Sequence, residues 1–206
     1  METNIITISR EFGSGGRTVG KDLAERLGWA YYDKEIIKQV AVETGFNEEF
    51  VAENGEYAPT KNLLSYILSS GNGTPGIMNG LSVGDFIWAV QSKVITNIAE
   101  KGSCVIVGRC ADYVLRNRGD CLNIFIHADM GARAERIVRL YGESEKSPEK
   151  RLEDKDKARR VYCKRHTGLD WGMSQNYNLS LDSSKIGIEK CADIVYTLVK
   201  ETEQNF

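Results

Sequence analysis

The feature that most constrains this chain is a glycine-rich turn between a short apolar strand and an amphipathic helix. Residues 4–8, Asn-Ile-Ile-Thr-Ile, form a compact β-branched run that is typical of a buried strand. Gly13-Ser-Gly-Gly16 follows, and this run is too flexible for the interior of a strand or a helix. Apolar side chains then recur every four residues from Val19 to Leu27, which predicts a helix that ends at Gly28.

Strand and helix patterns alternate along the rest of the chain. Further strands are expected at residues 29–32, 104–107, 123–126 and 177–181, and further helices at residues 33–41, 83–100, 132–140 and 186–199, with a highly charged helix ending near residue 166. We expect Asp33 to cap the helix that follows it. The alternation predicts an α/β fold with a parallel sheet and helices on both faces. We expect a single domain over residues 1–206, with residues 44–82 and 141–168 as excursions from the sheet edge, and a loop at residues 71–76.

Composition excludes several classes of function. The chain has 27 basic and 29 acidic residues, so no basic excess indicates a nucleic-acid partner. No apolar run is long enough to span a membrane, and residues 1–6 do not resemble a secretory signal, so we expect a soluble, cytoplasmic protein. The five cysteines are scattered, which favours neither a disulfide scaffold nor a zinc site. Nothing in the sequence indicates an oligomeric state.

The glycine-rich turn has the composition of an anion site. Its backbone N–H groups, with the first turn of the following helix, suit phosphate oxygens. Arg17 would clamp phosphate with two N–H groups, and Thr18 would offer its hydroxyl to phosphate or to Mg²⁺. The predicted phosphate-binding residues are Gly13, Ser14, Gly15, Gly16, Arg17 and Thr18. The turn lacks the lysine of the G-x-x-x-x-G-K-[ST] pattern, and the alternative is a tight turn without a ligand.

Four stretches together resemble the cytidylate kinase-like family, a branch of the P-loop nucleoside monophosphate kinases. They are residues 6–17, residues 105–113, residues 156–168 with Asp156-Lys-Ala-Arg159 and His166-Thr-Gly168, and residues 177–183. The resemblance covers nearly the whole chain. It implies a three-layer, P-loop NTPase-like fold with five parallel strands, a mobile acceptor-binding region at 44–82 and a mobile lid at 141–168.

The resemblance also implies ATP and Mg²⁺ as cofactors and nucleotides as partners. It places ATP at the first loop and a nucleoside monophosphate opposite, held by Arg109, Asp156 and Arg159, with Asp33 at the start of the monophosphate-binding helix. Gly16 stands where the related enzymes have the loop lysine, and Val107 replaces an acidic residue that would help to place Mg²⁺.

Phosphoryl transfer mainly requires positioning and cancellation of charge, which converging arginines supply. Arg17, Arg109 and Arg159 are the predicted catalytic residues. On the helix expected at 132–140, Arg133 or Arg136 is expected to reach the lid side.

The charged segment at residues 145–166 suits a lid over triphosphate. It holds nine Lys or Arg and five Asp or Glu, with only a thin apolar stripe of Leu152, Val161 and Tyr162. The alternative is a solvated helix with pairs such as Asp156–Arg160.

These observations predict an ATP-dependent nucleoside monophosphate kinase that acts on CMP or dCMP. Two alternatives stay open. One is a P-loop phosphotransferase for another small molecule, because residues 44–82 depart from the acceptor-binding pattern. The other is a catalytically inactive nucleotide-binding sensor or partner-binding protein.

Overall fold

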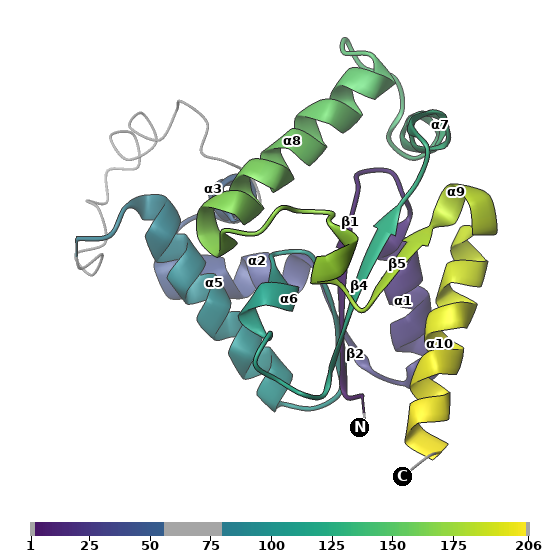
Figure 1. Ribbon diagram of the computed structural model, residues 1–206. Helices are drawn as coiled ribbons and strands as arrows, with labels where there is room; N and C mark the ends of the chain where they lie inside the picture. The colour runs from purple at the N-terminus through teal and green to yellow at the C-terminus, as the bar shows by residue number, and fades with distance from the viewer. Residues whose placement is uncertain (1–2, 56–79, 205–206) are drawn as a thin grey trace.

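The computed structural model describes residues 3–55 and 80–204, and the predicted loop at 71–76 lies outside them. One parallel sheet runs through the molecule in the order β2-β3-β1-β4-β5 (Figure 1). Its strands are β1 (Ile5–Arg10), β2 (Ala30–Tyr32), β3 (Cys104–Val107), β4 (Cys121–His127) and β5 (Leu179–Asp182). The predicted α/β class and five parallel strands are therefore confirmed.

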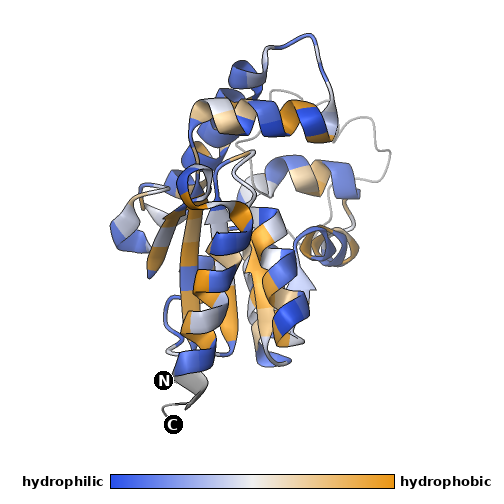
Figure 2. Ribbon diagram, turned by 90° about the vertical axis from the view of Figure 1, so that its right-hand side faces the viewer, coloured by the Kyte–Doolittle hydropathy of each residue, from blue (hydrophilic) through white to orange (hydrophobic). Residues whose placement is uncertain are grey.

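The central strand β1 is buried along its whole length, which explains its continuous β-branched run. Successive side chains point to opposite faces, so Ile5 enters one core cluster while Ile6 and Ile8 enter the other. Helices α1 (Gly16–Leu27) and α10 (Ile188–Gln204) cover the Ile6 face, and α2 (Lys34–Thr44), α3 (Glu48–Asn54) and α5 (Val83–Glu100) cover the Ile5 face. Figure 2 shows the apolar strands enclosed between helices with polar outer surfaces.

Two long helices lie beyond the carboxyl ends of the strands. Helix α7 (Met130–Tyr141) follows β4, and α8 (Pro148–Thr167) crosses above the sheet (Figure 1). The short helices α6 (Ala111–Val114) and α9 (Ser183–Ile186) follow β3 and β5, and η1 (Ser174–Asn176) lies in the connection from α8 to β5. Ligands of open parallel sheets bind at the carboxyl edge, so α7 and α8 form a roof over the expected site.

Several local predictions need correction. The closing helix predicted at 186–199 corresponds to α10, which begins at Ile188 because Gly187 adopts φ +85° and separates it from the short helix α9. Asp33 precedes α2 as expected, but its side chain makes no capping hydrogen bond there. Val161 does not join the apolar stripe of the charged helix, since it is 45% exposed, while Leu152 and Tyr162 are buried.

Within residues 3–55 and 80–204, no helix combines the length and apolar character needed to cross a membrane. Across those same residues, no group of three or more His, Cys, Asp or Glu side chains is arranged to hold a metal ion.

Candidate active site

The glycine loop joins the carboxyl end of β1 to the first turn of α1. Gly13 and Gly15 adopt φ +83° and +88°, a region where a side chain is strained. A Cβ at Gly15 would also lie 2.5 Å from Cδ1 of Ile188 in α10. Ser14 is buried, and its hydroxyl donates to the carbonyls of Glu11 and Ile126 at 3.0 and 2.9 Å. The loop is thus held by contacts with other elements of the fold.

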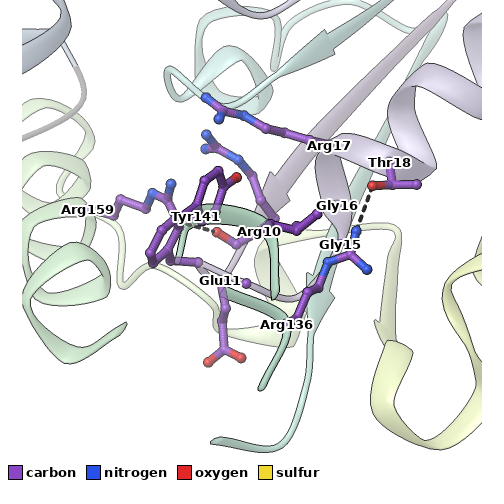
Figure 3. A pocket seen from close by; sticks show the side chains of 12 residues that line it. Arg10, Glu11, Gly15, Gly16, Arg17, Thr18, Arg136, Tyr141 and Arg159 are labelled. Atoms are coloured by element: carbon purple, nitrogen blue, oxygen red, sulfur yellow. Dashed lines mark hydrogen bonds between the residues drawn. The ribbon is translucent and has the colours of Figure 1, made fainter. Parts of the chain in front are cut away.

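Arginines converge on this loop. The pocket above it is lined by Arg10, Glu11, Phe12, Gly13, Gly15, Gly16, Arg17, Thr18, Arg136, Leu140, Tyr141 and Arg159. Four elements supply the arginines, namely β1, α1, α7 and α8 (Figure 3). Such a concentration of positive charge at one helix N-terminus favours a polyanion.

Arg17 lines this pocket, but it also forms an ion pair. Its Nε lies 2.8 Å from Oδ2 of Asp33, and its Nη2 donates to Oδ1 at 3.3 Å. The carboxylate that was expected to cap α2 therefore anchors Arg17 instead. Burial raises the pKa of the neighbouring Tyr31 to about 12, and the Asp33 charge adds to this rise. Arg17, Tyr31 and Asp33 line a second pocket beside the first.

Thr18 accepts a hydrogen bond from Nη2 of Arg136 at 2.8 Å (Figure 3). Burial and the nearby Arg139 charge lower the pKa of Arg136, so its guanidinium is partly desolvated and close to another cation. An anion bound here would offset both the desolvation of the Arg136 guanidinium and its repulsion by Arg139. Arg139 itself is exposed.

Asp156 ties the roof helices to the glycine loop. Its Oδ1 accepts the Phe12 N–H at 2.8 Å, and its Oδ2 lies 2.5 Å from Nη1 of Arg133. Nη1 of Arg159 is 3.5 Å from Oδ1 and donates to the Arg10 carbonyl at 3.1 Å. Asp156 and Arg159 are 4% and 5% exposed, so the alternative of a solvated Asp156 paired with Arg160 is wrong.

A third pocket contains Arg109. It is lined by Ser9, Arg10, Gly108, Arg109, Cys110, Arg159, Tyr162 and Trp171. Arg109 and Cys110 both adopt positive φ, +63° and +51°, in the turn that follows β3. Strain at two successive non-glycine residues is a recurrent feature of functional turns. Arg109 is buried, and Gln91 supports the turn by donating from Nε2 to the Arg109 carbonyl at 3.5 Å and to the Tyr162 hydroxyl at 3.1 Å.

The structure brings the predicted site residues together in two groups. Gly13 and residues 15–18 line the first pocket, while Arg109 lies in the third, and Arg159 lines both. Ser14 is buried and does not line the first pocket. Asp33 lies beside Arg17 in the second pocket, and the Asp156 carboxylate is directed at Arg133, Arg159 and the loop.

Arg10 lines the first and third pockets and was not singled out by sequence reasoning. The sequence feature that could have identified Arg10 is its position in the G-x-x-x-x-G-K-[ST] pattern. When Gly15 is taken as the second glycine, Arg10 replaces the first.

The parallel order 2-3-1-4-5, with a glycine loop after the central strand, defines a P-loop kinase fold. Solved structures agree. A shikimate kinase from Acinetobacter baumannii has a TM-score of 0.55 and 16% identity, with coverage of 97% of this chain and 94% of that one. A gluconokinase from Sinorhizobium meliloti has a TM-score of 0.53 and 15% identity, with coverage of 100% and 99%.

More narrowly, the chain belongs to the cytidylate kinase-like family, whose model matches residues 5–185. A cytidylate kinase from Aeropyrum pernix is 24% identical over 183 residues, which are 88% of this chain and 91% of that protein. Another from Pyrococcus horikoshii is 25% identical over 182 residues, 88% and 80% of the two chains. An uncharacterized protein from Eubacterium ventriosum has 27% identity and a TM-score of 0.70, with coverage of 95% and 98%.

Proposed function

We propose that this protein transfers the terminal phosphoryl group of ATP to a nucleoside monophosphate, with CMP or dCMP as the preferred acceptor. The observation that carries the proposal is the convergence of Arg10, Arg17, Arg136 and Arg159 on one glycine loop at the carboxyl edge of the sheet. The similarity to cytidylate kinases supports the choice of acceptor.

In this proposal the loop residues 13–18 hold the ATP phosphates at the N-terminus of α1. The backbone N–H groups of Gly15, Gly16 and Arg17 are the proposed donors, because those of Ser14 and Thr18 already donate to the carbonyls of Glu11 and Gly15. Arg109 holds the acceptor phosphate, since its strained turn and burial fix the guanidinium before the ligand arrives. Arg159 lines the pockets of both donor and acceptor, which suits a charge that stabilises the group in transit. Asp156 positions Arg159, and Asp33 positions Arg17.

Mg²⁺ usually reaches such a site on the triphosphate and keeps several waters. The donor set beside the loop fits that mode, because the Thr18 hydroxyl is a neutral oxygen at the start of α1. Thr18 would be a direct ligand after its hydrogen bond from Arg136 is exchanged for the ion. When bound, Mg²⁺ supplies charge neutralisation to the phosphates, and the surrounding guanidinium groups add to the same effect.

A coupled assay with ATP and Mg²⁺ over a panel of acceptors tests the proposal. The panel includes CMP, dCMP, UMP, AMP, GMP and shikimate, with product identity confirmed by mass spectrometry. Turnover that is highest with CMP or dCMP, and that requires a higher concentration of this acceptor in Arg109→Met, would support the proposal. Turnover with only a non-nucleotide acceptor would indicate a different phosphotransferase. Thermal stabilisation by ATP without any product would indicate a nucleotide sensor.

A further inference from the structure

We propose that Arg10, rather than Arg17, takes the place of the missing loop lysine and contacts the terminal phosphates of the donor. The inference rests on the proposed function, because it assumes that the glycine loop holds a polyphosphate. It depends on a spatial relationship between positions 10 and 16.

The two positions face each other across the loop. A Cβ built on Gly16 would lie 2.6 Å from Cβ and 3.0 Å from Cγ of Arg10. Real Cβ atoms essentially never approach to 2.6 Å, and both contacts are with the base of the Arg10 side chain rather than its mobile end. A long side chain is therefore accommodated at position 10 only because position 16 has none.

This is the reverse of the G-x-x-x-x-G-K-[ST] pattern, which has glycine at the first position and lysine at the seventh. With Gly15 as the second glycine, the first position is residue 10 and the lysine position is residue 16. This chain has arginine and glycine there. The large cationic side chain is retained, but it enters the same space from the end of β1 instead of from the start of α1.

Arg10 also lies where a transferred group would pass. It lines the pocket above the glycine loop and the pocket of Arg109, a property it shares with Arg159. Arg10 is 4% exposed, and its backbone carbonyl accepts the Arg159 N–H at 3.1 Å. Figure 3 shows the guanidinium ends of Arg10 and Arg17 extending to the same side of the loop.

Arg17 is less suited to this role. Its guanidinium is held by Asp33 at 2.8 Å, toward the second pocket, and 43% of its side chain is exposed. Arg10 is buried and lines the two pockets between which the phosphoryl group would move. A buried guanidinium forms stronger charge-assisted bonds with phosphate than an exposed one.

Titration calorimetry with ATP and with inorganic tripolyphosphate compares Arg10→Met, Arg17→Met and Arg116→Met. Methionine keeps the stem against Gly16 and removes only the charge. We expect Arg10→Met to weaken both ligands by at least about tenfold, the scale of one charged hydrogen bond. Arg17→Met should lose less affinity, and Arg116→Met, which changes an exposed side chain beside Tyr113, should match the wild type.

Variants that exchange the side chains of positions 10 and 16 give a second, independent test of the proposal. Gly16→Lys alone should lower the melting temperature, because a lysine side chain at position 16 and the Arg10 side chain cannot both be accommodated. Arg10→Gly alone should weaken ATP binding. The double variant Arg10→Gly/Gly16→Lys should recover both stability and ATP affinity, a non-additive result expected of two residues in contact.

The proposal is overturned if Arg10→Met binds ATP as the wild type does, if Arg17→Met loses more affinity than Arg10→Met, or if the wild type binds neither ligand. It is also overturned if the double variant is no more stable than Gly16→Lys and binds ATP no more tightly than Arg10→Gly. A different result would reject the kinase proposal alone. Loss of ATP binding in Arg10→Met, with no nucleoside diphosphate formed by the wild type, would support Arg10 as a phosphate contact and reject the kinase activity.

Discussion

The Asp156 carboxylate accepts the backbone N–H of Phe12 at 2.8 Å, joining α8 to the glycine loop across 144 positions of sequence. The same carboxylate pairs with Arg133 of α7. One buried anion therefore holds the loop and both roof helices in a common arrangement. A buried ion pair adds little stability over an apolar core, but removal of one partner is costly because the other charge stays buried.

Asp156→Asn should therefore be strongly destabilising. The amide oxygen can still accept the Phe12 N–H, while Arg133 and Arg159 lose the Asp156 charge, and Arg133 keeps Glu11 as an acidic partner at 3.5 Å from its Nε. We expect a loss of about 3 kcal/mol, the lower end for a broken buried pair. For a chain of this length that corresponds to a fall of about 6–12 °C in melting temperature by calorimetry.

The matched control is Asp154→Asn on the same helix. Asp154 pairs with Lys146 at 2.7 Å, but on the exposed side, where such pairs contribute little. Its melting temperature should stay at the wild-type value. Equal shifts for the two variants would mean that α8 does not anchor the loop as described.

Gly15 should resist substitution for two separable reasons. Alanine there would be strained at φ +88° and would meet the Ile188 side chain at 2.5 Å. Gly28→Ala isolates the first effect, since Gly28 has φ +69° and nothing within 4 Å of its built Cβ. We expect about 1 kcal/mol of destabilisation for Gly28→Ala, the usual cost of the left-handed region, and a larger loss for Gly15→Ala.

The double variant Gly15→Ala/Ile188→Ala separates the two causes further. When Ile188 is already alanine, the Gly15→Ala substitution no longer meets the isoleucine side chain, so it should cost only the backbone strain. The losses of unfolding free energy from the two substitutions should therefore be non-additive in urea unfolding. Additive losses would show that Ile188 does not pack against the loop.

Arg109→Met should weaken the binding of the phosphate acceptor and leave the binding of ATP unchanged. Arg109 lies in a pocket that excludes residues 13–18, so its loss should raise the KM for CMP at least about tenfold while the Kd for ATP stays within about twofold. Arg116→Met is the control, because Arg116 is exposed and stacks on Tyr113 at 4.0 Å. A parallel loss of ATP affinity in Arg109→Met would argue against separate donor and acceptor sites.

Asp112 should make stability depend on pH. Burial raises the pKa of this α6 carboxyl to about 6, above the value near 3.9 of an unfolded chain. Between these values the folded protein binds the proton more tightly, so this stabilising contribution is present below about pH 4 and is lost as the pH rises to about 6. Asp112→Asn should remove that slope in urea unfolding measured from about pH 4 to 7. The same slope in wild type and Asp112→Asn would mean that Asp112 is solvated in the folded protein.

The contribution of Asp120 to stability should depend on pH in the opposite direction to that of Asp112. The hydrogen bond from Arg118 holds the pKa of Asp120 below its usual range. Its contribution is therefore present at neutral pH and is lost as the pH falls through that low pKa. Asp120→Asn should lower stability at neutral pH and leave it unchanged in strong acid, as measured by the same urea unfolding. A loss that is equal at both ends of the pH range would assign the effect to packing instead of charge.

Much of the architecture was predictable because strand and helix patterns are local. The β-branched run in β1 and the four-residue spacing in α1 each arise within one element, and the structure confirms both. Short elements such as α6 were missed, since four residues are too few to show a period. The start of α10 at Ile188 rather than at residue 186 depended on the conformation of Gly187, which composition alone did not indicate.

The site was predictable only in part. Five of the six predicted loop residues line one pocket, together with Arg159, which was expected beside the acceptor. The partner of Asp156 was not predictable, because Arg133 is 23 positions away on another helix and Arg160 had the better local spacing. In the same way, Asp33 has the sequence of a helix cap, but the nearby Arg17 guanidinium offers a stronger partner than a backbone N–H.

The amino-acid order by itself determined the alternation of strands and helices, the glycine turn after β1 and the gathering of cationic residues toward one sheet edge. These follow from apolar periodicity and backbone freedom, which act over a few residues. Only the tertiary structure decided which guanidinium lies against the glycine that replaces the lysine and which carboxylate holds the roof helices. Those outcomes depend on how the loop folds back on β1 and how α7 docks on α8, where residues distant in sequence compete for the same buried space.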